Sequence, residues 1–174
     1  DAYIIDAEGT WDAQGDVISD TRKIITEYKT QTGKPVAWCW WPLMHVPNGT
    51  GVYHNKAILA EAMKWADYAM PMAYWNWTSD PTGVRFLEET VRQWREVTDK
   101  PLIIAGRAYN DAYGAASYQA VKAFDTRARE LGSIGISWWD AQHAVKLPEC
   151  WKALTETLKF GSEVNPMWEN NALI

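Results

Sequence analysis

The stretch Tyr3-Ile4-Ile5-Asp6-Ala7-Glu8-Gly9-Thr10-Trp11-Asp12 joins an apolar run to an acidic and aromatic segment. The apolar run is typical of a buried parallel strand, and the residues that follow it form the loop at the carboxyl end of that strand. A nucleotide-binding sheet would carry a loop rich in glycine, serine or threonine at this point, to hold phosphate groups. The acidic loop therefore disfavours a nucleotide-binding protein.

Outward from this stretch, the same alternation of apolar runs and amphipathic segments recurs along the chain. The spacing is roughly thirty residues, which is the size of one β/α unit. On the first predicted helix, Val17, Ile24 and Ile25 fall on one face, and Gly33 follows as a helix stop. The pattern predicts an α/β protein with five parallel units. The predicted strands cover residues 3–8, 35–41, 68–75, 102–109 and 134–139.

Five parallel units are compatible with two architectures. One is a doubly wound, five-stranded sheet of the flavodoxin type, and the other is the C-terminal five units of a TIM-type (β/α)8 barrel. The acidic loop after the first strand favours the partial barrel. We assign residues 1–160 to this domain and residues 161–174 to a C-terminal extension. The apolar first strand would be an open edge, so we expect a partner chain or a preceding N-terminal segment to cover it.

Composition narrows the classes of partner and cofactor. The net charge of −5, with both signs interspersed, gives no basic face for a nucleic acid. No apolar stretch approaches the ~20 residues needed to cross a membrane. Cys39 and Cys150 lack the spacing of a metal site, so we expect buried thiols and neither metal nor cofactor. The 12 tryptophans indicate either heavy core packing or a cleft that stacks against sugars.

Asp6 and Glu8 are the leading catalytic candidates. Two positions apart on a strand, their side chains point to the same side. In a barrel, that side is the interior, and the active site forms at the carboxyl end of the strands. Close carboxylates have pKa values that are driven apart, which would leave one protonated near neutral pH as a general acid. The alternative is that the two acids cap the first helix or contact only solvent.

Tyr74 is the third catalytic candidate. Along the predicted strand 68–75, Met70, Met72 and Tyr74 share one face, while Trp75 lies on the other. Tyr74 would then face Glu8 and could donate a hydrogen bond to a reacting sugar, although it could also be an ordinary interior aromatic residue.

The candidates for substrate binding lie at or near the carboxyl ends of predicted strands. Aromatic faces there could stack on a sugar, and Arg107 could bind a carboxylate or form a structural salt bridge. Trp77, in the loop after the third strand, is a further candidate for stacking. The substrate-binding set is Trp40, Trp41, Met72, Trp75, Arg107, Tyr109, Trp139 and Asp140.

Three short motifs carry a resemblance to a known family. The Asp-x-Glu strand end, the run Met-Pro-Met-Ala-Tyr-Trp and the run Ser-Trp-Trp-Asp resemble the fourth, sixth and eighth strands of family 18 chitinase-type barrels. Asp1, Asp6 and Glu8 match that family's Asp-x-x-Asp-x-Asp-x-Glu pattern, with Ile4 in place of the second aspartate. Family 25 lysozymes are similar, and related strands also occur in barrel proteins of bacteria and their phages for which the family implies only a fold.

The resemblance implies a mechanism. Glu8 would protonate the glycosidic oxygen, Asp6 would orient the substrate's acetamido group for attack on the anomeric carbon, and Tyr74 would help to hold that group. Under the lysozyme-type resemblance, a further acid would lie on the first strand of the barrel. The leading hypothesis is a retaining glycoside hydrolase that acts on an N-acetylhexosamine polymer, chitin-like or peptidoglycan, in a secreted, cell-wall or virion setting. The alternative is a non-catalytic carbohydrate-binding or structural barrel domain, which the replacement at Ile4 favours.

Overall fold

Five parallel strands form one curved sheet in the computed structural model, which describes residues 2–9, 11, 16–47, 51–76 and 78–162. The spatial order of the strands is their order along the chain. A doubly wound sheet reverses its strand order at a switch point, whereas a barrel does not. The prediction of a partial barrel is therefore confirmed, and the doubly wound alternative is wrong. The strands are β1 (Tyr3–Asp6), β2 (Val36–Trp40), β3 (Tyr68–Pro71), β4 (Leu102–Arg107) and β7 (Ser133–Trp139).

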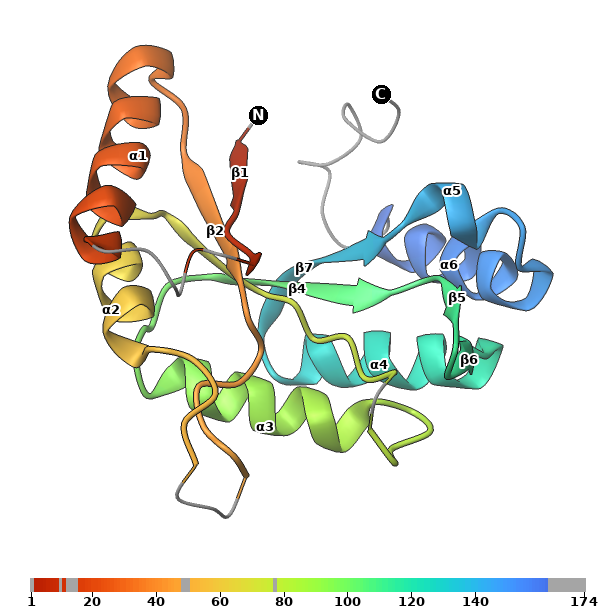
Figure 1. The fold of residues 1–174 in the computed structure, drawn as a ribbon. Helices are drawn as coiled ribbons and strands as arrows, with labels where there is room; N and C mark the ends of the chain where they lie inside the picture. Colours follow the sequence, from red (N-terminus) through yellow and green to blue (C-terminus); the bar gives the residue numbers. More distant parts are fainter. Residues whose placement is uncertain (1, 10, 12–15, 48–50, 77, 163–174) are drawn as a thin grey trace.

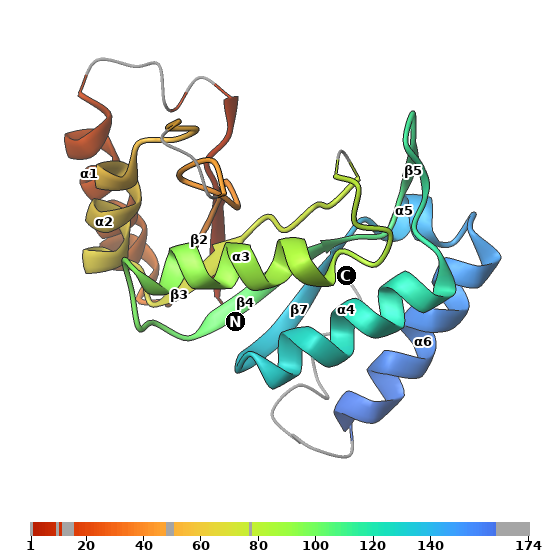
Figure 2. The ribbon, with the colours of Figure 1, turned by 90° about the horizontal axis from the view of Figure 1, so that it is seen from below.

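Helices connect the strands and lie around one side of the sheet. Figures 1 and 2 show the first four of them, α1 to α4, following the outer side of the curve. The loop after β4 also contains a small antiparallel hairpin, β5 (Asn110–Asp111) and β6 (Gly114–Ala115), which the periodicity did not predict. The helices are α1 (Val17–Thr32), α2 (Lys56–Trp65), α3 (Val84–Arg95), α4 (Tyr118–Glu130), α5 (Ala141–Ala144) and α6 (Pro148–Ser162).

The helix ends follow their local sequence. The Asp16 side chain accepts a hydrogen bond from the Ser19 backbone at the start of α1, and Gly33 ends that helix with φ of 65°. A left-handed conformation of this kind suits glycine, so the predicted helix stop is confirmed. Helix α6 ends at Ser162, beyond the predicted domain boundary at residue 160, and the rest of the predicted C-terminal extension lies outside the described residues.

Alternation along the strands divides the buried side chains between the two faces of the sheet. The helix-covered face carries the main core, to which β2 contributes Trp38 and Trp40, both fully buried. Full burial of large apolar side chains contributes roughly 1.5–3 kcal/mol each, so this face supplies most of the stability. The concave face, which would be the barrel interior, carries a smaller cluster of Cys39, Met70, Met72 and Ala105.

Both edges of the sheet are open within the described part of the chain. β1 pairs only with β2, and β7 pairs only with β4. Large apolar side chains are exposed at both edges, including Ile4 at 54% and Ile134 at 47%. Exposed apolar surface on unpaired strands is a template for association with another polypeptide.

None of the helices in the described residues is both long and apolar enough to span a membrane.

The approach of α3 to the sheet gives a test of the fold. Gly83 precedes α3 with φ of 73°, and a Cβ atom there would overlap the Trp75 ring, whereas a Cβ atom at Gly33 would meet nothing within 4 Å. We expect Gly33→Ala to cost about 1–2 kcal/mol of unfolding free energy, from the left-handed backbone alone. Gly83→Ala should cost roughly 1–3 kcal/mol more because of overpacking. Equal losses in urea denaturation would contradict the Trp75 contact.

Candidate functional site

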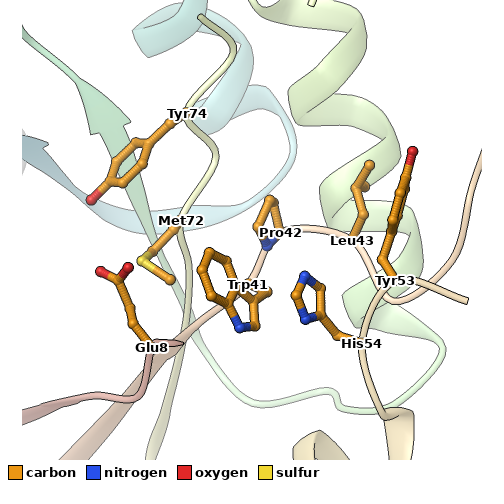
Figure 3. A pocket seen from close by; sticks show the side chains of 8 residues that line it. All are labelled: Glu8, Trp41, Pro42, Leu43, Tyr53, His54, Met72 and Tyr74. Atoms are coloured by element: carbon orange, nitrogen blue, oxygen red, sulfur yellow. The ribbon is translucent and has the colours of Figure 1, made fainter. Parts of the chain in front are cut away.

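An open pocket of about 250 Å³ lies beside the acid pair, past the carboxyl ends of β1, β2 and β3. Figure 3 shows Glu8 and Tyr74 on one side of it, and Leu43 and Tyr53 on the other. A concave, mostly apolar pocket with a few polar groups is the usual form of a small-molecule site. Its lining residues are Glu8, Trp41, Pro42, Leu43, Tyr53, His54, Met72 and Tyr74.

Asp6 and Glu8 both lie on the concave side of β1. Asp6 pairs in register with Cys39, which belongs to the concave cluster, while Ala7 between the two acids is packed in the main core. The N-terminal cap of α1 is Asp16, so neither acid caps that helix. Strand parity therefore places the two carboxylates together, as the sequence predicted.

The surroundings of the two acids favour their neutral forms. Partial burial raises the pKa of Asp6, and a hydrogen bond from the Cys39 thiol lowers it by less. Partial burial also raises the pKa of Glu8, and the nearby negative charge of Asp6 raises it further. Desolvation and a like charge both penalise ionisation. Glu8 thus retains its proton to a higher pH than an ordinary glutamate does, as a general acid requires.

Tyr74 lies where the sequence placed it. Figure 3 shows its hydroxyl pointing toward the Glu8 carboxylate, with Met72 close to both residues. Burial raises the pKa of Tyr74 above its ordinary value, and the nearby carboxylates of Asp6 and Glu8 raise it further, so Tyr74 remains a hydrogen-bond donor at neutral pH. Tyr109 packs edge-on against Tyr74 at 6.1 Å between ring centroids. The predicted face shared by Met72 and Tyr74 is confirmed.

Trp41 forms the floor of the pocket together with a residue that the sequence did not single out. The Trp41 and His54 rings stack at 4.7 Å between centroids, with planes 9° apart. The Trp94 indole donates a hydrogen bond of 3.1 Å to the Trp41 carbonyl oxygen and fixes the end of β2. Tyr53, His54 and Leu43 come from the loop between β2 and α2, where periodicity carries no information about the path of the chain.

Trp40 and Trp75 do not lie at the pocket, which corrects two predicted substrate-binding residues. Trp40 is 0% exposed and Trp75 is 3% exposed, and both belong to the core under the helices. Trp75 stacks on Phe124 of α4 at 4.8 Å between centroids. The sequence put both at the carboxyl end of a strand, but strand alternation turns them away from the concave side.

Arg107 has a structural role in the described residues, so its assignment to substrate binding is also corrected. Its side chain is buried and donates hydrogen bonds to the carbonyl oxygens of Tyr109 and Gly114. It lies 3.6 Å from the Asp111 carboxylate and against the Tyr109 ring. Arg107 thereby holds the β5–β6 hairpin against the end of β4, and Tyr109 borders the site through its contact with Tyr74 and its electrostatic interaction with Glu8.

Two predicted substrate-binding residues, Trp139 and Asp140, lie at the carboxyl end of β7, and neither lines the pocket. Trp139 is 54% exposed at the open edge of the sheet, on the concave side, and does not line the pocket. Asp140 caps α5 by accepting a hydrogen bond from the His143 backbone, and its carboxylate lies 2.8 Å from the His143 ring nitrogen. Asp140 is therefore committed to a local cap, which corrects its substrate-binding assignment. Asp1 and Trp77 lie outside the described residues.

Cys39 and Cys150 are free and buried, which confirms their prediction as buried thiols. Among the residues that the structure describes, no group of three or more His, Cys, Asp or Glu side chains is arranged to hold a metal ion.

The fold is that of a partial (β/α) barrel, with five of the eight units that a complete barrel contains. The chain resembles solved TIM-barrel glycoside hydrolases in structure. It is similar to the endo-beta-1,4-mannanase of Thermotoga petrophila with a TM-score of 0.64 and 13% identity, covering 94% of this chain and 44% of that one. It is also similar to the spore cortex-lytic enzyme SleL of Bacillus megaterium QM B1551, with a TM-score of 0.58 and 11% identity, covering 80% of this chain and 44% of that one.

A family GH18 chitinase from Cycas revoluta matches with a TM-score of 0.52 and 13% identity, covering 82% of this chain and 62% of that one. The chain thus spans between 44% and 62% of the length of these three structures. No protein-family model and no curated protein matches the sequence. At these identities the likeness concerns the fold, and it confirms the predicted resemblance to glycosidase barrels at that level.

The hydrogen bond between Cys39 and Asp6 gives a prediction that does not depend on activity. In the parent, the hydrogen bond from the Cys39 thiol lowers the pKa of Asp6. Cys39→Ala removes this donor, so the pKa of Asp6 should rise. Cys39→Ser retains a donor and should leave that pKa nearer the parent value. Carbon-detected NMR titration of the carboxyl groups measures both. An unchanged pKa of Asp6 in Cys39→Ala would show that the thiol does not stabilise the carboxylate.

Proposed function

We propose that this chain carries the acid site of a retaining glycoside hydrolase acting on a polysaccharide that contains N-acetylhexosamine, chitin-like or peptidoglycan. The observation that carries the proposal is the acid pair itself. Asp6 and Glu8 emerge on the concave side of β1 beside a pocket shared with Tyr74, and the pKa of Glu8 is raised by burial and by Asp6. A protonated carboxyl beside an ionisable one is the arrangement that glycosidic bond cleavage requires.

The proposed steps use three residues in distinct roles. Glu8 transfers its proton to the glycosidic oxygen as the bond to the anomeric carbon breaks, so the leaving sugar departs as an alcohol. The acetamido oxygen of the substrate attacks the anomeric carbon, which makes the reaction substrate-assisted. Asp6 orients the acetamido group and balances its developing positive charge, while the Tyr74 hydroxyl donates a hydrogen bond to the same group. Glu8, now ionised, then removes a proton from the water that completes hydrolysis.

Support for the sugar class comes from the lining and from the related fold. The pocket presents Trp41, Tyr53 and His54, whose flat rings suit the apolar faces of pyranose sugars. A mutant of the Cycas revoluta chitinase, to which this chain is similar in fold, has been solved in complex with (GlcNAc)3. An N-acetylglucosamine oligomer is therefore the first ligand to test.

The second candidate function is a carbohydrate-binding barrel domain without catalysis. The observation that favours it is Ile4, an apolar and exposed side chain at the position where the chitinase-type strand carries an aspartate. An acid there would add a further charge two residues from Asp6, so its absence changes the electrostatics of the pair. The two functions share the pocket and differ in turnover.

Glu8→Gln separates these two functions. The amide retains the shape of the side chain but cannot donate the proton, so hydrolysis of chitooligosaccharides or peptidoglycan should fall by roughly 10²–10⁴-fold. Binding of the same oligosaccharides, measured by calorimetry, should persist. In the parent, activity should decline as pH rises through the raised pKa of Glu8. Turnover that survives Glu8→Gln would eliminate Glu8 as the acid, and binding without turnover in the parent would support the non-catalytic function.

We also propose that further parallel strands cover the open edges of the sheet in the working protein, from a preceding segment of the polypeptide or from a partner chain. A complete barrel has eight strands, and only five are present in the described residues. Ile4 and Ile134 would then be buried against the added strands.

The open edges predict self-association of this chain when nothing covers them. Ile4→Lys and Ile134→Lys place a charge on the exposed surface of an edge strand and should shift the chain toward monomer in sedimentation velocity experiments. Val52→Lys, at a side chain that is 77% exposed in the loop between β2 and α2 and not on an edge strand, is the control and should have no effect. If the control and the edge variants behave alike, the edges are not sites of association.

A further inference from the structure

One side of the pocket is built by a short arm, defined here as the described residues 43–47 and 51–54 of the loop between β2 and α2. The two halves of the arm pair in antiparallel fashion at His45 and Val52. Backbone hydrogen bonds join Val46 to Gly51 at 2.9 Å and Tyr53 to Met44 at 2.8 Å. The arm is therefore a regular hairpin-like element, and its pairing fixes the direction in which Tyr53 and His54 project.

A buried side chain of α3 holds the base of this arm. Gln93 is 0% exposed, and its Oε1 accepts hydrogen bonds from the backbone N–H groups of Met44 at 2.7 Å and His45 at 3.1 Å. Its Nε2 donates to the His45 carbonyl oxygen at 3.0 Å and to a Glu89 carboxylate oxygen at 2.7 Å. A buried amide with every hydrogen bond satisfied fixes its partners strongly. Three of these four bonds go to the arm, so its position is set before any ligand binds.

The arm presents an aromatic surface that leads away from the acid pair. Figure 3 shows Glu8 and Tyr74 at one end of the pocket, Trp41 and His54 in the middle, and Tyr53 at the far end. Tyr53 is 48% exposed, so about half of its side-chain surface is open to a ligand beside the pocket. A second hollow, of about 520 Å³, adjoins the pocket and shares Tyr53 and His54 with it. The wall between the two hollows is therefore aromatic on both sides.

We propose that this arm is a second binding element for the polymer, with Tyr53 stacking on a sugar unit beyond the one bound at Glu8. The inference rests on the proposed function and deepens it, because it makes the site selective for chains over short oligosaccharides. Gln93 acts as a positioning residue, since it touches no ligand and holds the arm. Preorganisation of this kind contributes to affinity by reducing the ordering that binding would otherwise require.

The test measures binding of chitooligosaccharides from disaccharide to hexasaccharide to the full chain by calorimetry. In the parent, affinity should rise with length. Tyr53→Ala should weaken hexasaccharide binding roughly fivefold to tenfold and leave disaccharide binding within about twofold, as expected for loss of one aromatic stacking contact. Tyr28→Ala removes a tyrosine of similar exposure on α1, at 40%, and should change the affinity for neither the disaccharide nor the hexasaccharide.

Gln93→Leu tests the positioning role. It keeps the Tyr53 side chain but removes the hydrogen bonds that hold the arm, so the affinity for oligosaccharides should rise less with their length than it does in the parent. If Gln93→Leu does not fold, Tyr53→Ala still decides the proposal. Equal weakening at all lengths, or none at any length, overturns it, and so does an absence of oligosaccharide binding in the parent. Turnover is measured separately, so length-dependent binding without hydrolysis would overturn the proposed catalysis and leave the binding element standing.

Discussion

The alternation of side chains along five parallel strands is the constraint on which the rest of this structure depends. Ala7 must enter the core under the helices, and that requirement turns Asp6 and Glu8 to the concave side. The same constraint directs Ala73 into the core and brings Met72 and Tyr74 to the pocket. The packing that stabilises the chain therefore also aims the candidate catalytic groups, and a slip of one residue in the register of β1 would remove Glu8 from the pocket and turn Asp6 away from the concave side.

The concave face combines packing with chemistry. Cys39 and Met72 belong to its small apolar cluster and lie next to the acid pair. This apolar neighbourhood raises the pKa values of Asp6 and Glu8 by desolvation, and the cost of placing two acids there is tolerated because both remain partly open to solvent. A pocket of this kind keeps a carboxyl protonated to a higher pH than that of an ordinary side-chain carboxyl. Hydrolysis and simple sugar binding would both use it, and the fate of the Glu8 proton distinguishes them.

Tertiary contacts from outside the sheet complete the pocket. The end of β2 is fixed by the Trp94 indole, and the arm that carries Tyr53 and His54 is fixed by Gln93, which lies next to Trp94 on α3. On the other side, Arg107 holds the β5–β6 hairpin and supports Tyr109 against Tyr74. The helix layer thus shapes the site through buried polar groups as well as through apolar packing.

The sequence by itself determined the five units, the parallel sheet and the acid pair, because apolar periodicity and strand parity depend only on residues that are close together along the chain. It also determined the resemblance to glycosidase barrels, which the solved structures confirm for the fold. The tertiary structure shows which of the residues at the strand ends reach the pocket. Trp40 and Trp75 are buried under the helices, Arg107 and Asp140 are committed to local contacts, and His54 enters from a loop. Strand parity already turns Trp40 and Trp75 away from the pocket, and the contacts of Arg107 and Asp140 span at most seven residues. Only the packing of helices and loops, through contacts between residues far apart in the sequence, closes the face that Trp40 and Trp75 reach and brings His54 to the site.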